Sequence, residues 1–262
     1  MIQSLTMNSI NERQESILNL FDATTFIKVS EIAEELNVSE VTIRKDLKLL
    51  ESKGLLYRTH GGARKQSNRV HDIHVNEKEA INVSQKIAIA QYAANYVNEN
   101  DFIIIASGTT LRHFAKQLTN FNKLTVITPS LIVANELCND NNIDVIQLGG
   151  EVRKSSASVV GSIAETILKE FSCNKLFLSV DGIDTEFGLS TSNAAEAHLN
   201  NLMINCANKV YILADSSKIN KRGFGKICSI TEVNTLITDK GITEKQLQQF
   251  TEKGVDVVIV DN

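Results

Sequence analysis

Four loops that each follow an apolar run carry the residue types with the clearest chemistry. Ser107-Gly108-Thr109-Thr110 follows Phe102–Ala106 and opens a helical segment, so its hydroxyls and first free backbone N–H groups can hold a phosphate. The other three loops bring a glycine pair, two carboxylates and an ammonium group: Gly149-Gly150, Asp181-Gly182-Ile183-Asp184 and Asp215-Ser216-Ser217-Lys218. An anion cradle beside carboxylates and a cation suits a phosphorylated sugar.

A second group of candidate residues lies on one basic helical segment. Ile43, Leu47 and Leu50 recur at helical spacing and form an apolar stripe that must join a core. The residues that fall off this stripe and point away from the core are Thr42, Arg44, Lys45 and Lys48. Ser39 precedes the segment, and its hydroxyl can cap the helix.

A basic hairpin follows this helix. Two extended pieces, Leu55–Thr59 and the residues from Ala63 onward, flank the turn Gly61-Gly62. Residues 41–69 contain eight lysines and arginines against two acidic residues, although the whole chain has a formal net charge of -4. Any attraction to nucleic acid must therefore be local. A basic helix followed by a basic hairpin favours a winged helix-turn-helix over an ordinary solvated surface.

Residue types predict which side chains contact double-stranded DNA. Cations suit guanine edges and phosphates, whereas serine and threonine suit phosphates and thymine methyl groups. The candidate DNA-binding residues are therefore Ser39, Thr42, Arg44, Lys45, Lys48, Arg58 and His60. For His60, a structural hydrogen bond inside the hairpin is an equal alternative. Asp46 is expected to orient a neighbouring arginine, because a carboxylate repels phosphate.

From residue 80 onward, apolar runs of strand length alternate with helical segments. The expected strands are Phe102–Ala106, Thr125–Thr128, Asp144–Leu148, Lys175–Val180, Val210–Ala214, Thr235–Thr238 and Val255–Val260. This alternation predicts an α/β domain with a mostly parallel sheet covered on both faces. Parallel strands end at one edge of a sheet, so the four loops should converge there. The alternative is that they carry only turn chemistry and that the domain merely dimerises.

The chain divides into three segments: a DNA-binding domain over 1–64, a polar connection over 65–79 and a sensor domain over 80–262. His71 and His74 lie in the connection without further ligands, so no metal site is expected, and no cofactor is expected either. The four cysteines are scattered, which is typical of a reducing compartment. With no signal pattern and no apolar run of membrane length, we expect a soluble cytoplasmic protein.

Both halves of the chain resemble the DeoR family of bacterial transcription regulators. The resemblance rests on Val29–Ala33, Thr42–Leu47 and Arg58–Ala63 in the first half, and on the four strand-end loops in the second. It implies a winged helix-turn-helix followed by an effector domain related in fold to ribose-5-phosphate isomerase. It also implies a repressor that binds operator DNA as a homodimer or homotetramer and senses a phosphorylated sugar.

The resemblance also implies roles for the loops and marks three departures. Ser107, Gly108, Thr109 and Thr110 would hold the phosphate, with Asp181, Asp184 and Lys218 lining the sugar. The departures are Lys45 in place of a second arginine, Ala106 in place of an aspartate and Pro129 in place of an asparagine. The alternative function is a sugar-phosphate isomerase with a DNA-binding appendage. Against it, the isomerase's glycine-rich run has no counterpart, and Glu196 is the nearest candidate for its glutamate.

Overall fold

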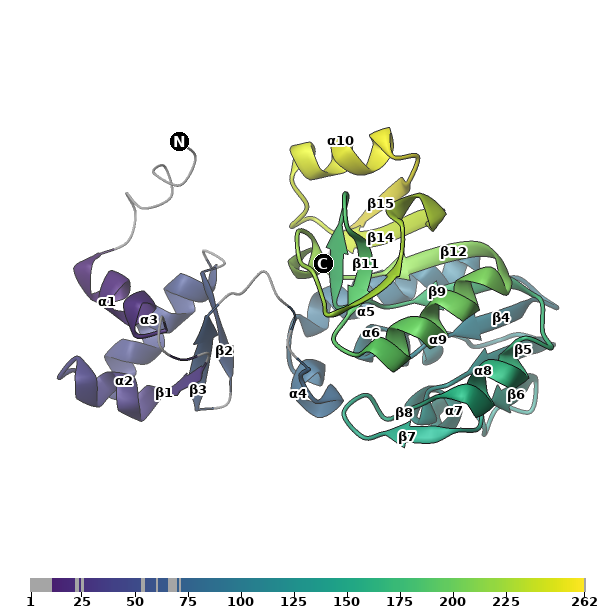
Figure 1. Ribbon diagram of the computed structural model, residues 1–262, viewed down its shortest axis with the longest axis horizontal. Helices are drawn as coiled ribbons and strands as arrows, with labels where there is room; N and C mark the ends of the chain where they lie inside the picture. Colours follow the sequence, from purple (N-terminus) through teal and green to yellow (C-terminus); the bar gives the residue numbers. More distant parts are fainter. Residues whose placement is uncertain are drawn as a thin grey trace. The chain divides into compact units, whose positions relative to one another are not determined.

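The protein is represented by a computed structural model that describes residues 11–21, 24, 26–52, 55–59, 61–65, 70 and 72–261. The chain forms two compact units, residues 1–67 and 68–262. The connection expected over 65–79 therefore contributes most of its residues to the second unit, where Val75–Glu79 is the short helix α4. Figure 1 shows the elements of each unit.

The first unit combines three helices with a small antiparallel sheet. Its elements are α1 (Glu12–Leu20), β1 (Phe26–Lys28), α2 (Val29–Glu35), α3 (Glu40–Ser52), β2 (Leu56–Thr59) and β3 (Gly62–Lys65). The strands lie in the order β1-β3-β2, so the strand before α2 joins the hairpin after α3. The expected stripe of Ile43, Leu47 and Leu50 is buried against Ile17 and Ile32 of the other two helices. The winged helix-turn-helix prediction is confirmed.

The second unit is built on a parallel sheet of seven strands. These are β4 (Phe102–Ile105), β5 (Leu124–Thr128), β6 (Ile143–Gln147), β9 (Cys173–Leu178), β12 (Ala207–Leu213), β14 (Thr235–Asp239) and β15 (Asp256–Val260). Their order is β15-β14-β12-β9-β4-β5-β6. The chain thus builds outward from β4 through β5 to β6, then crosses to the other side of β4 and continues with β9. The strand order reverses between β4 and β9, and ligands bind at such a point in open parallel sheets.

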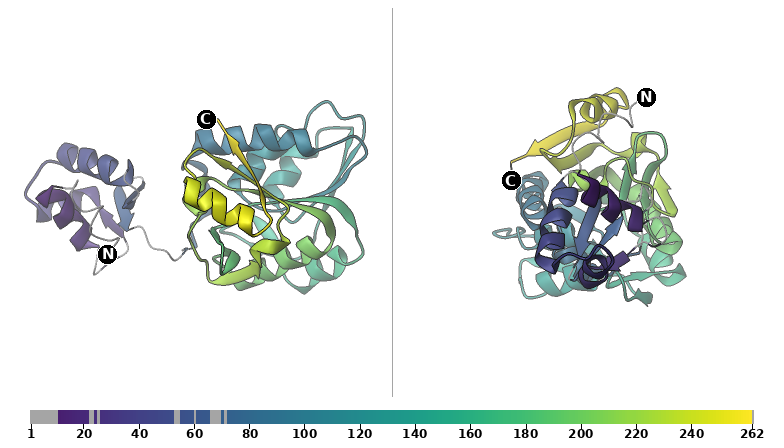
Figure 2. Two further views of the ribbon diagram at one scale, coloured as in Figure 1. Left: turned by 90° about the horizontal axis from the view of Figure 1, so that it is seen from above. Right: turned by 90° about the vertical axis from the view of Figure 1, so that its left-hand side faces the viewer.

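Helices cover both faces of this sheet, as the views in Figures 1 and 2 show. On one face α5 (Val83–Ala93), α6 (Thr109–Ala115) and α7 (Leu131–Leu137) pack in series. α8 (Ser162–Leu168) packs against α9 (Ala194–Asn205), which lies on β9 and β12, and α10 (Glu244–Glu252) packs on β15. The prediction of a covered parallel sheet is confirmed.

Two small antiparallel sheets, which the apolar runs did not reveal, extend from this framework. One is the hairpin of β7 (Glu151–Arg153) and β8 (Ser158–Val160), and the other contains β10 (Gly182–Asp184), β11 (Gly188–Thr191) and β13 (Gly225–Cys228). Their strands have three or four residues each, too short to show a convincing period in the sequence.

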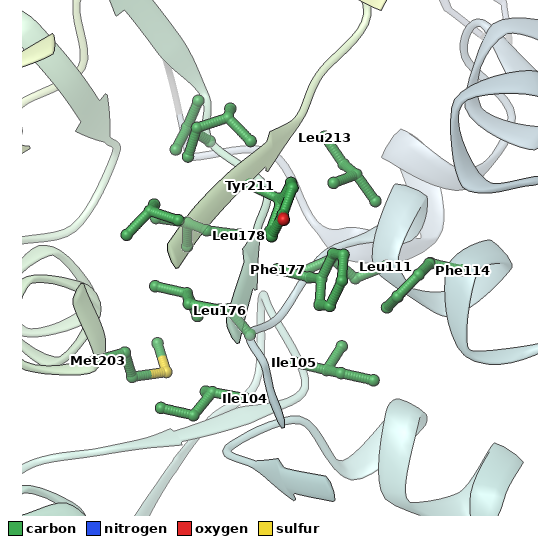
Figure 3. Packing of buried hydrophobic residues seen from close by; sticks show 14 of the residues in the cluster. Ile104, Ile105, Leu111, Phe114, Leu176, Phe177, Leu178, Met203, Tyr211 and Leu213 are labelled. Atoms are coloured by element: carbon green, nitrogen blue, oxygen red, sulfur yellow. The ribbon is translucent and has the colours of Figure 1, made fainter. Parts of the chain in front are cut away.

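An aromatic cluster in the sheet's core holds its central strands against the helices (Figure 3). Phe177 of β9 is fully buried, with ring centroids 4.4 Å from Phe114 of α6 and 5.1 Å from Tyr211 of β12. Such ring pairs add stabilisation beyond their buried area. The cluster therefore fixes the strand ends that carry the candidate effector loops.

None of the helices in the described part of the chain combines the length and apolar character needed to cross a bilayer.

Candidate functional site

The exposed face of α3 carries the predicted DNA-reading residues. Arg44, Lys45 and Lys48 are exposed, whereas Ile43 and Leu47 on the opposite face are buried. Arg44 Nη2 lies 2.8 Å from Glu40 Oε2, one helical turn earlier. Both partners of this pair are about half exposed, so the pair is weak and can open when a phosphate or base approaches.

The remaining candidate DNA-binding residues lie at the start of α3 and on the wing, which is the hairpin of β2 and β3. Ser39 caps the helix, since its Oγ accepts from Thr42 N at 3.3 Å and lies 3.0 Å from Thr42 Oγ1. Arg58 is exposed on β2, and its backbone N–H donates to Glu51 Oε1 at 2.9 Å. His60 lies outside the described residues, so its two alternatives stay predictions.

Asp46 stabilises the first unit, as expected from its sign. Its Oδ2 accepts from Arg13 Nε at 2.6 Å, and its Oδ1 accepts from Arg13 Nη2 and Gln14 Nε2, both at 3.2 Å. Burial raises the pKa of Asp46, but the hydrogen bonds from Arg13 and Gln14 outweigh it and hold the pKa below its usual value. The carboxylate thus ties α1 to α3.

In the second unit, the Ser107–Thr110 loop lies at the strand-order switch. Gly108, with φ +140°, precedes α6, and a Cβ added to it would lie 3.2 Å from Ser179 Cβ at the end of β9. Thr109 and Thr110 are buried in the first turn of α6. The first turn of α6 leaves backbone N–H groups without partners inside the helix, and such groups can hold an anion.

Asp181 follows β9 at this edge and is held by a lysine from far away in the sequence. Lys78 Nζ of α4 lies 2.5 Å from Asp181 Oδ1, while Thr191 Oγ1 donates to Asp181 Oδ2 at 3.0 Å. Burial raises the pKa of Asp181, but Lys78 and Lys218 outweigh it and bring the pKa to about 2. Asp181 is therefore a carboxylate at neutral pH and can accept hydrogen bonds from sugar hydroxyls.

Lys218 and two further lysines, Lys86 and Lys221, act on Asp215, which follows β12. Asp215 Oδ1 accepts from Asn82 Nδ2 at 2.9 Å, and the pKa of Asp215 stays low because Lys218, among other groups, outweighs the effect of burial. Burial lowers the pKa of Lys86 and of Lys221 to about 8, against the attraction of Asp215. A dianion brought beside these lysines would favour their charged forms, so the cluster suits a phosphate.

Glu196 and Arg153 complete the site and were not assigned to it by their sequence context. Ser107 Oγ donates to Glu196 Oε1 at 3.1 Å, and Arg153 Nη1 lies 3.3 Å from Glu196 Oε2. Thr191 Oγ1 lies 3.1 Å from the same Oε2 and so connects Glu196 with Asp181. Arg153 lies on β7 and Glu196 on α9. Only the tertiary fold brings these two elements to this edge, so no local motif could have revealed either residue.

Other predicted effector-binding residues make contacts within the chain itself. Asp184 is carried away on β10, where Arg222 Nε and Nη2 donate to its two oxygens at 2.8 and 3.0 Å. Gly150, with φ +147°, allows a close approach of the chain itself, since a Cβ there would lie 2.8 Å from Val160 O. Gly149 is exposed beside it and would meet only side chains of α8, no nearer than 3.9 Å. All four loops follow strands of the parallel sheet, as predicted, but Gly150 and Asp184 make contacts within the chain, and the ligand roles of these residues stay predictions.

Two of the three departures from the family pattern, Ala106 and Pro129, also make contacts within the chain. Ala106 is fully buried, and its backbone N–H donates to Phe177 O at 3.0 Å. Pro129 O accepts from Val159 N at 2.9 Å and joins β5 to the β7–β8 hairpin. A metal site was not expected, and the described residues contain no cluster of three or more metal-ligating side chains.

A winged helix-turn-helix joined to an α/β unit with a candidate anion-binding edge is the arrangement of a ligand-responsive transcription regulator. The comparisons agree: residues 13–69 match the model of the DeoR-like helix-turn-helix domain, and residues 81–240 match that of the DeoR C-terminal sensor domain. The chain belongs to the DeoR family of transcription regulators.

Relatives align over nearly the whole chain. An uncharacterized HTH-type transcriptional regulator, YulB of Bacillus subtilis, is 40% identical over 96% of this chain and 97% of its own length. A putative aga operon transcriptional repressor of Escherichia coli O157:H7 is 32% identical over 95% of this chain and 94% of its own. A lactose phosphotransferase system repressor of Lactococcus lactis is 35% identical over 92% and 95%.

Among solved structures, ribose 5-phosphate isomerase A from Methanocaldococcus jannaschii matches 53% of this chain and 55% of its own, with 17% identity and a TM-score of 0.39.

Proposed function

We propose that this regulator represses an operon of carbohydrate metabolism and is released from its operator by a phosphorylated sugar. Relatives aligned over more than nine tenths of the chain are named repressors of an aga operon and of a lactose phosphotransferase system. In this proposal two or four copies of the chain bind the operator, and the effector changes how the DNA-binding units are spaced across half-sites.

The proposed contacts follow from the chemistry of each side chain. On the duplex, Arg44 and Lys45 read guanine edges or hold phosphates, and the other contacts come from Ser39, Thr42, Lys48, Arg58 and His60. In the sensor unit the effector's phosphate lies against Ser107, Gly108, Thr109 and Thr110. Asp181 and Lys218 face the sugar, whereas the ion pair with Arg222 argues against a direct role for Asp184.

A single observation supports the effector proposal: the loops after β4, β9 and β12, which carry Ser107–Thr110, Asp181 and Lys218, follow neighbouring strands of one parallel sheet. Gly108 lies against Ser179 across the switch between β4 and β9, and Lys218 acts on the charge of Asp181. Phosphate needs donors and cations, while sugar hydroxyls need an acceptor such as Asp181.

The test is DNA binding at fixed salt to the region upstream of the chain's own gene, with and without each of several sugar phosphates. We expect binding to that duplex over an unrelated one, and one phosphosugar that weakens it while raising the melting temperature. A ligand at one hundred times its dissociation constant adds about 2.7 kcal/mol of stability. Operator affinity that ignores every phosphosugar would contradict the sensor role, and a monomer on DNA would contradict the assembly.

Sugar-phosphate isomerisation is a second candidate, because the structure brings Glu196 to Ser107 and, through Thr191, to Asp181. A carboxylate beside a bound sugar could act as a general base. Against this, Oε2 of Glu196 is already engaged by Arg153 Nη1 at 3.3 Å and by Thr191 Oγ1 at 3.1 Å. Incubating the pure protein with ribose 5-phosphate and following ketose formation decides between the two, since turnover would favour the enzyme.

A further inference from the structure

The segment Asp72–Glu79, here called the strap, follows the DNA-binding unit in the chain and is fastened to the sensor site at both ends. At its start Asp72 contacts the β7–β8 hairpin and the loop after β11. Val75 N donates to Ser155 O at 2.7 Å. At its end Lys78 pairs with Asp181. Any signal that leaves the sensor along the chain toward the DNA-binding unit passes through the strap.

Asp72 binds to an arginine of the effector site. Its Oδ1 lies 2.5 Å from Arg153 Nη2 and accepts from Ser192 Oγ at 3.2 Å, and its Oδ2 accepts from Ser155 Oγ at 3.3 Å. Arg153 Nη1 pairs at the same time with Glu196, which accepts from the hydroxyl of Ser107 in the anion cradle. One guanidinium therefore connects the strap to the cradle through a single carboxylate.

The bond between Arg153 and Asp72 is close but poorly directed. Although 2.5 Å separates Nη2 from Oδ1, the two atoms form no hydrogen bond, and Nη2 is buried without a hydrogen-bond acceptor among the described residues. Charge attraction thus holds the pair while a donor stays unsatisfied. An incoming anion that offered Nη2 a well-directed oxygen would bind it better than Asp72 does.

Negative charge entering the cradle is repelled by the carboxylates already there, so an anion binds better if one of them moves away. Asp181 and Glu196 are each only 11% exposed and have several partners apiece, whereas the side chain of Asp72 is 47% exposed. Of the three carboxylates, Asp72 therefore gives up the least interaction free energy when it leaves the site and returns to water. We propose that Asp72 occupies Arg153 in place of the effector's anionic group, and that an anionic effector displaces it and releases the strap. This inference rests on the proposed sensing of a phosphorylated sugar.

The test uses the full chain with inorganic phosphate as the probe and the variant Asp72→Asn. Removing one competing charge should tighten phosphate binding about fivefold, measured as the phosphate dependence of the melting temperature. A purely structural role for Asp72 would give the opposite sign, because a loosened site binds more weakly. Asp261→Asn, which breaks the exposed pair with Lys240, is the matched control and should leave phosphate binding unchanged.

Hydrogen exchange of the strap gives an independent readout. Saturating phosphate should speed exchange at residues 72–79 of the wild type, including the amide of Val75 that donates to Ser155 O. In Asp72→Asn the same amides should exchange fast without phosphate, and phosphate should add little.

The outcomes separate this inference from the proposed function. Phosphate that stabilises the wild type but leaves strap exchange unchanged, or an Asp72→Asn variant that binds phosphate no more tightly, overturns the exchange at Arg153 and leaves sugar-phosphate sensing intact. A protein stabilised by neither phosphate nor any phosphosugar overturns both.

Discussion

Replacing Arg44 and Lys45 one at a time should separate base reading from phosphate binding on α3. Both side chains are exposed, and the face that packs on the core contains neither, so Arg44→Ala and Lys45→Ala should fold as the wild type does. If Arg44 makes a bidentate guanine contact, its loss removes about 1–3 kcal/mol, or about 5- to 150-fold in operator affinity. Discrimination against an unrelated duplex should fall with it.

Lys45→Ala should behave differently if Lys45 holds a phosphate. Affinity should fall on operator and unrelated DNA alike, and the slope of log affinity against log salt should decrease by about 0.9. Glu40 offers a third variant, because Glu40→Gln frees Arg44 from an exposed pair worth about 0.3–0.5 kcal/mol and removes a charge that repels phosphate. Operator binding should then tighten about twofold.

Fluorescence anisotropy measures the affinity of all three variants for labelled operator and unrelated duplexes, each over a series of salt concentrations. Lys169→Ala, an exposed lysine of the second unit, is the control. The assignment of α3 as the reading helix is refuted if Arg44→Ala and Lys45→Ala bind both duplexes as the wild type does while their circular dichroism is unchanged.

Three further predictions concern stability. The pKa of Asp181 is about 2 in the folded chain and near 3.9 when unfolded, so this carboxylate adds about 2 kcal/mol at neutral pH. That contribution fades as pH falls from about 5 to about 2, and the stability difference between wild type and Asp181→Asn in urea titrations should narrow over that range; a constant difference would contradict it. Asp46→Ala leaves the buried Gln14 amide without its acceptor, so the free energy of unfolding of the first unit should fall by about 1–3 kcal/mol. Thermal unfolding measures this loss, and an unchanged melting temperature would contradict the stabilising role of Asp46. Gly188→Ala would place a Cβ 2.0 Å from Cys228 O at φ +99°, so it should destabilise by more than about 2 kcal/mol in denaturant titrations, whereas Gly254→Ala, with open space around it, should cost less; equal losses would refute the clash.

The sequence was sufficient for the parts of the fold that have a local period. The stripe of Ile43, Leu47 and Leu50 predicted α3 and its buried face, because a helix brings residues three and four apart to one side. The long apolar runs predicted the parallel sheet, because strands buried on both faces need apolar residues at every position. The position of the Ser107–Thr110 loop then followed from the rule that parallel strands end at one edge.

Where a residue of a local motif has a partner far away in the chain, the sequence does not show that contact. Asp181 and Asp184 stand in one motif, yet β10 turns away from the parallel sheet and gives Asp184 to Arg222, thirty-eight residues later. The pair Gly149-Gly150 suggested an approach to a ligand, but Gly150 makes room for the chain's own β8.

By itself, the sequence determined the two kinds of domain, the basic reading helix and the loop that can hold an anion, since each depends on neighbours within a few residues. Only the tertiary structure decided which charges share the effector site. Asp72 meets Arg153, and Arg153 meets Glu196, across gaps of 81 and 43 positions, and Lys78 meets Asp181 across 103. An ion pair depends on distance in space, and no periodicity along the chain encodes a contact between elements so far apart.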